Sequence, residues 1–241
     1  ITVIFLEIYL KNVRWAIDKT MWIVENSTSV RFLLGMMMTK ERAHVRKGDL
    51  TRAAILDVAL DVASRDGLEG VTIGILADRL DMSKSGVFSH FGSRDELLIE
   101  VLKEYETRFL ADILKPALAL PRGLERLRAI LHNWFNKLGQ ETEHGCLYIS
   151  GAVEYDDRPG VVRDELVGLM TAWEEQLRRA IRYCIDSGEF REDTPIDLMI
   201  FELYGLTLGF HQSVRLMKRT NGMDMVKQVL ERILKQYLRT T

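Results

Sequence analysis

One stretch, residues 72–96, constrains the fold more than any other part of the chain. It predicts two short helices joined by a tight turn, followed by the first turn of a third helix. The turn is centred on Asp81, at a position that requires a positive φ, which Asp tolerates better than most residues. Ser83 is suited to cap the second helix, and Ser93 with Glu96 forms a capping box that begins the third.

The second helix of this pair presents a small, polar face to solvent. Val87 and Phe91 are expected to point inward, against Ile75 and Leu76, which leaves exposed Lys84, Ser85, Gly86, Ser89 and His90. A helix with such an N-terminal face can enter the major groove of DNA, because bulky side chains would hold it away from the base edges. The pattern therefore predicts a helix that reads DNA.

The block SKSGVFSHFGSRDELL, preceded by ILADRL, resembles the helix-turn-helix of TetR-type transcriptional regulators, over about residues 51–98. The later phrase GCLYISGAVEYDDRPGVVRD resembles a subgroup of these regulators. The resemblance implies an all-α homodimer with an N-terminal DNA-binding unit and a C-terminal ligand-binding and dimerisation unit. It also implies phosphate contacts at Thr72, Phe88 and Arg94, and base-edge contacts at Lys84, Ser85, Gly86 and either Ser89 or His90, with Ser83 as a further DNA-binding candidate.

Two positions depart from the family's pattern. Phe88 stands where Tyr is usual, and a phenyl ring has no hydroxyl to offer a phosphate. Gly74 stands where many members carry a polar or basic residue.

A basic segment, which includes Arg46 and Lys47, directly precedes the first predicted helix. Such a segment is often no more than a solvated run of charges. Its position before the motif equally favours contact with the DNA backbone. The net charge of the chain is −2, so DNA binding must depend on a local basic patch.

The first 39 residues precede the part that resembles the family. Their apolar run is interrupted by Glu7, Lys11 and Arg14, well short of the roughly 20 apolar residues of a membrane span. Either translation naturally begins near Met36, or the segment is a functional extension, and in both cases we expect it to pack poorly against the core. The expected domains are residues 1–39, residues 40–95 with the basic arm, and residues 96–241.

The C-terminal part reads as a series of helices. They are expected from Ser93 to about Leu114, from about Pro121, over LYISGAVEY, in a long helix ended by Gly188, from Thr194 as N-cap to Asn221, and from Met223 to Arg239.

Aromatic and polar-tipped residues are spread over these helices. Any one of them is most simply core, but together they predict a pocket for a small, largely apolar effector. The candidates are Trp134, Cys146, Tyr148, Trp173, Phe201, Tyr204 and His211. Cys146 is open to two interpretations, a sensor of electrophiles or a simply buried thiol.

The last two predicted helices are the candidates for a dimer interface. The first is apolar nearly all round, and its two glycines would let helices cross closely. The interface is expected at Gly205, Gly209, Val226, Val229, Ile233 and Tyr237. The alternative is that the glycines make room for a ligand or for packing within one subunit.

We therefore expect a homodimeric repressor that a small, largely apolar molecule releases from a palindromic operator. Cys146 and Cys184 lie far apart in the sequence, which indicates a reduced, cytoplasmic setting. No metal, cofactor or membrane contact is expected. The alternatives are a helical enzyme and a protein-interaction module without DNA binding. No enzyme is expected, because the carboxylates Glu154, Asp156 and Asp157 lie beside a Pro-Gly turn and are more simply a solvated cap.

Overall fold

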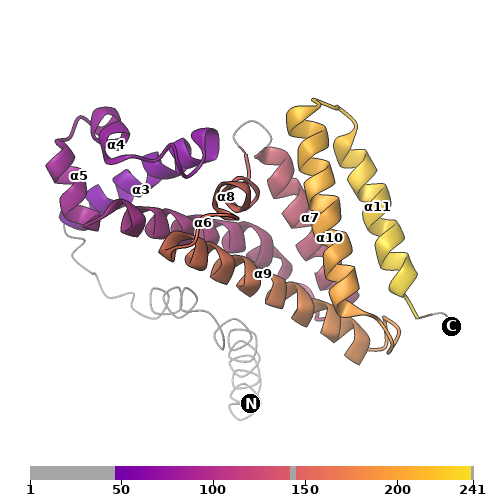
Figure 1. Ribbon diagram of the computed structural model, residues 1–241. Helices are drawn as coiled ribbons and strands as arrows, with labels where there is room; N and C mark the ends of the chain where they lie inside the picture. The colour runs from indigo at the N-terminus through magenta and orange to yellow at the C-terminus, as the bar shows by residue number, and fades with distance from the viewer. Residues whose placement is uncertain (1–46, 142–144, 240–241) are drawn as a thin grey trace, which may run out of the picture. The chain divides into compact units, whose positions relative to one another are not determined.

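The computed structural model describes residues 47–141 and 145–239. These residues form nine α-helices and one π-helical segment, which confirms the predicted all-α fold (Figure 1). Within this part of the chain, none of the helices is both long and apolar enough to cross a membrane. The extension of residues 1–39, Arg46, the Lys47 side chain and His144 lie outside the described residues.

Three helices make up the N-terminal domain, namely α3 (Lys47–Asp66), α4 (Ile73–Leu80) and α5 (Lys84–Phe91). The hydroxyls of Thr72 and Ser83 cap α4 and α5 by accepting from the N–H groups of Ile75 and Gly86. Asp81 has φ 52° and ψ 44°, the left-handed conformation expected at this turn. Ile75 is partly exposed instead of packing beneath α5, because Leu76 and Ala77 occupy the inward face of α4.

Helix α6 (Arg94–Ala117) begins at the Ser93 cap and packs against α3 and α5, then against α7 and α9. It continues through Pro116, three residues beyond the predicted end at Leu114. A proline in the last turn removes one backbone hydrogen bond. Burial of Ala117 in the core favours that last turn nonetheless.

The C-terminal domain continues with α7 (Leu124–Gln140), α8 (Leu147–Tyr155) and α9 (Val161–Asp186). Helix α7 begins three residues later than expected, after Gly123. The carboxylate of Glu189, distant in sequence, accepts from the Leu124 N–H at 2.8 Å and so caps this helix. No pattern in the neighbouring sequence predicts a cap from a residue so far along the chain.

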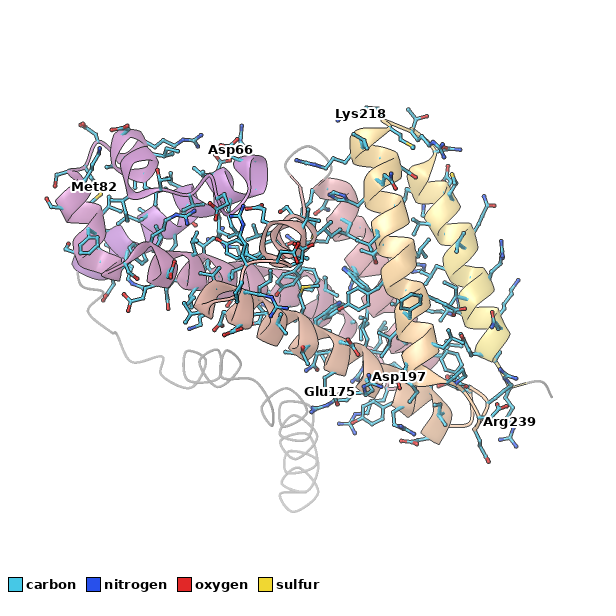
Figure 2. All side chains as sticks on the ribbon, in the orientation of Figure 1. Asp66, Met82, Glu175, Asp197, Lys218 and Arg239 are labelled. Carbon is cyan, nitrogen blue, oxygen red and sulfur yellow. The ribbon has the colours of Figure 1, made fainter. Side chains whose placement is uncertain are left out.

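Helices α10 (Ile196–His211) and α11 (Gly222–Tyr237) lie side by side (Figure 1). Helix α10 passes into a π-helical segment, η1 (Gln212–Leu216), instead of continuing as an α-helix to Asn221. Thr194 does not cap α10, because its hydroxyl donates to the Arg191 carbonyl. Arg178 of α9 forms ion pairs with Glu175 of its own helix and with Asp197 in the first turn of α10, and so links the two helices. Glu175 and Asp197 lie close together in Figure 2.

The apolar circumference of α10 is divided between core and surface. Met199, Ile200, Leu203 and Phe210 are buried, whereas Leu198, Phe201 and Leu208 are exposed, Phe201 by 75%. Within one protomer this helix, which is apolar nearly all round, is therefore buried on one side only. A Cβ built at Gly205 or Gly209 meets no atom within 4 Å.

Candidate nucleic-acid interface and ligand pocket

The N-terminal face of α5 is open to solvent. Lys84, Ser85, Phe88 and Ser89 are exposed, and Gly86 and His90 are partly exposed, while Val87 and Phe91 hold the helix to the core. The Ser89 hydroxyl donates to the Gly86 carbonyl at 2.7 Å, which keeps it close to the helix surface. The structure thus brings most of the predicted base-reading residues onto one exposed helix face.

Lys84 provides the cationic group of this face. Its ammonium lies beside Gly74 at the start of α4, where a built Cβ would be 3.8 Å from the Lys84 nitrogen. Within the described residues no carboxylate forms an ion pair with it, so its charge is available to a phosphate or a base. Phe88 is half exposed and offers a flat apolar surface at the position where family members usually carry a hydroxyl.

Arg94, by contrast, is engaged inside the protein. Its guanidinium donates to the carbonyls of Leu68, Glu69 and Val71 at 3.1–3.3 Å, and it lies 3.5 Å from the Glu69 carboxylate. These bonds tie the start of α6 to the loop between α3 and α4. The geometry assigns Arg94 a positioning role, and its use as a phosphate contact would compete with these bonds.

The same loop is held from its other side by α8. The Glu154 carboxylate accepts from the N–H groups of Leu68 at 3.3 Å and Glu69 at 2.8 Å. Gly67 makes this approach possible, because it has φ +77° and a Cβ there would stand 2.2 Å from the Glu154 oxygen. Sequence reasoning treated Glu154 as a carboxylate beside a turn and missed this contact.

Glu69 receives two further groups from the C-terminal domain. The Tyr155 hydroxyl donates to it at 2.9 Å, and Arg158 lies 3.1 Å away. The hydrogen bond from Tyr155, together with Arg94 and Arg158, lowers the pKa of Glu69. The loop of residues 67–71 is therefore a place where the C-terminal domain holds the DNA-binding domain by hydrogen bonds and an ion pair.

An apolar cavity of about 320 Å³ lies between α6, α7, α8, α9 and α10. We call it the aromatic pocket, and the residues that line it are Phe109, Trp134, Cys146, Tyr148, Ile149, Ala152, Val153, Asp156, Met170, Trp173, Tyr204, Thr207 and Leu208. Its rings pack edge to face, with centroids 5.0 Å apart for Phe109 and Trp173 and 5.2 Å apart for Trp134 and Trp173.

Five of the seven predicted ligand residues line this pocket, namely Trp134, Cys146, Tyr148, Trp173 and Tyr204. Phe201 and His211 do not. Phe201 lines a separate hollow beside α9 and α10 and is largely exposed, and His211 lies at the end of α10, where burial and Arg215 lower its pKa. Phe109 was not anticipated, although its position four residues after Tyr105 on a buried helix face is a signal for it.

Cys146 is a buried wall residue of the pocket. Burial and the nearby Glu141 carboxylate raise the pKa of its thiol to about 11. The Tyr105 hydroxyl lies 3.4 Å from the sulfur and donates to Glu141 at 3.1 Å. A thiol with a raised pKa is a poor nucleophile at neutral pH, so this environment does not favour an electrophile sensor.

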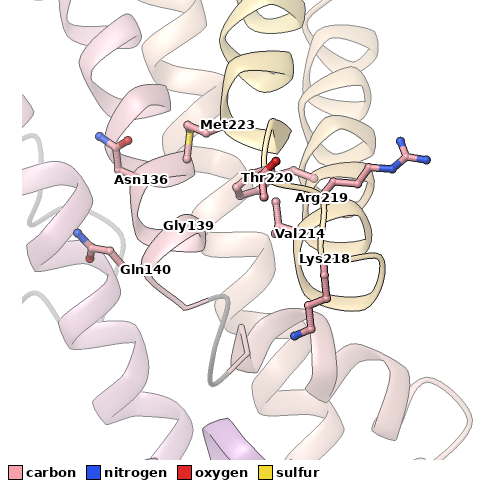
Figure 3. Close-up of a pocket in the computed structure, with 9 residues that line it drawn as sticks. Asn136, Gly139, Gln140, Val214, Lys218, Arg219, Thr220 and Met223 are labelled. Atoms are coloured by element: carbon pink, nitrogen blue, oxygen red, sulfur yellow. The ribbon is translucent and has the colours of Figure 1, made fainter.

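A second, larger hollow of about 580 Å³ lies beside the turn between α10 and α11 (Figure 3). It is open to solvent and is edged by the exposed side chains of Lys218 and Arg219, and Figure 3 shows Arg219 extending away from the other lining residues. The aromatic pocket is the better ligand site, because apolar rings enclose it on several sides. Among the described residues, no group of three or more His, Cys, Asp or Glu could hold a metal ion.

The exposed recognition helix on a three-helix scaffold, joined to a helical domain with an apolar pocket, defines a helix-turn-helix regulator. Residues 55–101 match the family model of bacterial regulatory proteins of the tetR family, and residues 123–230 match the tetracyclin repressor-like C-terminal domain. The chain belongs to the TetR family of transcriptional regulators.

Among curated proteins, the chain is 23% identical to the transcriptional repressor AcnR of Corynebacterium glutamicum, over 75% of this chain and 90% of that protein. It is 22% identical to the repressor KstR2 of Mycobacterium tuberculosis, over 61% of this chain and 73% of that protein. The crystal structure of a TetR-family regulator from Cytophaga hutchinsonii has a similar fold, with a TM-score of 0.71, 22% identity and coverage of 83% and 100% of the two chains.

Lys84 and Arg94 should respond differently to substitution. We expect Lys84→Ala to weaken DNA binding and lower the salt dependence of affinity by about one unit per recognition helix, without loss of stability. Arg94→Ala should lower the free energy of unfolding by about 1–3 kcal/mol, because three backbone carbonyls lose a charged donor. Urea unfolding and DNA mobility shifts at several salt concentrations measure both effects. Equal stability of the two variants would contradict the positioning role of Arg94.

Glu154→Gln tests the contact between α8 and the loop of residues 67–71. We expect faster hydrogen exchange at the amides of Leu68 and Glu69 and a loss of about 1–2 kcal/mol in unfolding free energy, because an anionic acceptor for two N–H groups is removed. Glu192→Gln, at an exposed position between α9 and α10, is the matched control. Unchanged exchange at both amides would show that the carboxylate does not hold this loop.

Proposed function

We propose that this protein is a homodimeric transcriptional repressor that leaves its DNA operator when a small, largely apolar molecule occupies the aromatic pocket. One observation carries the proposal. A single chain combines an exposed recognition helix with an enclosed apolar pocket, and α8 contacts both the pocket and the DNA-binding domain. The relatives AcnR and KstR2 are both named repressors, which supports repression as the mode of action.

The positive charge that attracts DNA phosphates must come from a few groups near the recognition helix. Between residues 47 and 96 the chain carries more acidic than basic side chains. Several of these carboxylates are neutralised within the protein, as Asp57 is by Arg108 and Asp61 by Arg65 and Arg79. Lys84, the N-terminus of α5 and the basic segment with Arg46 and Lys47 would then supply the attraction to phosphates.

The response to a ligand would run through α8. Ile149, Ala152 and Val153 line the pocket, whereas Glu154 and Tyr155 hold the loop of residues 67–71. A ligand that shifts α8 would move this loop and with it the DNA-binding domain. Such a ligand lowers DNA affinity only if it binds the state with separated recognition helices more tightly than the DNA-bound state.

The dimer interface is proposed on the outer face of α10. This face carries Leu198, Phe201 and Leu208, with Gly205 among them and Gly209 at its edge. Apolar side chains so exposed on one helix favour contact with a second copy. Val226, Ile233 and Tyr237 of α11, which the sequence placed in the interface, are buried in their own protomer, and Val229 is partly buried, so α10 supplies the centre of the proposed interface.

Replacing both Gly205 and Gly209 with Leu should give monomers and abolish operator binding. Both added side chains have open space in the protomer, so the fold should persist while close approach of a second α10 is blocked. Sedimentation measures the oligomeric state, and mobility shifts measure operator binding. The double variant Gly205→Ala and Gly209→Ala is the control, since it removes the same glycines, adds only methyl groups and favours the helix by up to about 1 kcal/mol per site. A Leu variant that remains dimeric would contradict this interface.

The proposed function itself is tested by selecting bound DNA from a genomic pool. The expected product is an inverted repeat whose half-sites lie about 34–36 Å apart, as two recognition helices require. Lys84→Ala should fail to enrich it. A wild-type protein that enriches no sequence over random DNA at low salt would exclude a sequence-specific regulator.

A further inference from the structure

The aromatic pocket contains two polar groups that have no hydrogen-bond partner within the described residues, the Tyr148 hydroxyl and the Trp173 indole N–H. Both side chains are more than nine-tenths buried, with exposed fractions of 6% and 2%. Both rings pack on Phe109, with centroid distances of 5.2 Å and 5.0 Å, and both line the cavity. Buried polar groups in proteins are almost always paired, so two unpaired groups on side chains that line one cavity call for an explanation.

The chemistry of these groups defines what would satisfy them. An indole N–H can only donate, and a phenol hydroxyl can donate as well as accept. A ligand that pairs with both must therefore present a hydrogen-bond acceptor to this wall. Thr207, another polar residue of the lining, already donates to the Leu203 carbonyl at 2.9 Å and does not compete.

The electrostatic surroundings restrict the charge of that ligand. In the described part of the chain, no Lys, Arg or His lines the pocket, and the charged residue that does so is Asp156. Burial and the carboxylate of Glu106 raise the pKa of Tyr148, and burial and Glu174 raise that of Tyr204. An anionic ligand would therefore meet negative potential without a cationic partner, and a cation, which presents no acceptor, would leave the Trp173 N–H unpaired.

We propose, on the basis of the ligand-responsive function above, that the pocket binds a neutral and mostly apolar molecule whose carbonyl or ether oxygen accepts from Tyr148 and Trp173. The cavity of about 320 Å³ stands at the lower end of the roughly 300–1,000 Å³ that is usual for small-molecule sites. The effector is therefore a compact molecule, with one polar end against α8 and α9 and its apolar body among the rings.

Four probes that share one ring system separate these possibilities: 2-acetylnaphthalene, 2-isopropylnaphthalene, 2-naphthoate and trimethyl(2-naphthyl)ammonium. Their binding to the full chain is measured by titration calorimetry. We expect the ketone to bind at least about tenfold more tightly than the hydrocarbon, the size of one well-formed buried hydrogen bond. The carboxylate should bind more weakly than the ketone, and so should the ammonium ion.

Tyr148→Phe and Trp173→Phe should each remove most of the preference for the ketone and leave affinity for the hydrocarbon within about twofold. Tyr183→Phe, on α9 outside the pocket, is the control and should change neither affinity. Tyr148→Phe should also keep or raise the melting temperature, because it deletes a hydroxyl that has no partner among the described residues.

The inference is overturned if the ketone shows no saturable binding, if it binds no better than the hydrocarbon, or if the carboxylate or the ammonium ion binds more tightly. A fall of several degrees in the melting temperature of Tyr148→Phe would also overturn it, since the hydroxyl would then have a partner within the protein. These readouts do not involve DNA. Failure of ketone binding with intact operator selection rejects the ligand class alone, whereas failed selection rejects the proposed function.

Discussion

The structure depends first on burial of the apolar side of α6 along its whole length. Its N-terminal half places Leu97 and Val101 in the core beneath α3 and α5, and its C-terminal half places Phe109 and Ile113 among α7 and α9. One unbroken helix thus belongs to two cores. A helix of this kind is stiff over several turns, so under the proposed function a change in packing around Phe109 would reach its other end.

The second point of connection is polar. The loop of residues 67–71 carries backbone groups that its own turn cannot satisfy, and both neighbouring elements supply partners for them. Arg94 donates to its carbonyls and Glu154 accepts from its N–H groups. Val153 lines the aromatic pocket, and the next residue, Glu154, binds the loop. The pocket and the contact with the loop therefore share one short helix. Hydrogen bonds of this type are modest in free energy, which suits a contact that must change between two states.

Sequence patterns predicted the local structure correctly where the residues that determine it are close together in the chain. The Ser83 cap, the left-handed Asp81 and the Ser93 cap depend on neighbours within three residues, and each was predicted correctly. One prediction failed because a distant residue intervened: the start of α7 is set by Glu189, 65 residues along the chain. The cap of α10 failed for a local reason, since the Thr194 hydroxyl donates to the Arg191 carbonyl three residues before it.

The sequence by itself determined the all-helical fold, the recognition helix and a set of aromatic residues, because helical periodicity and capping are local properties. The tertiary structure decided which of these residues meet. It placed Trp134, Tyr148 and Trp173 around one cavity and left Phe201 on the surface, although all four are aromatic residues on helices. It also engaged Arg94 within the protein, since the carbonyls that bind its guanidinium lie more than twenty residues away. Which polar groups remain unpaired depends on every neighbour in space, and the order of residues along the chain does not specify those neighbours.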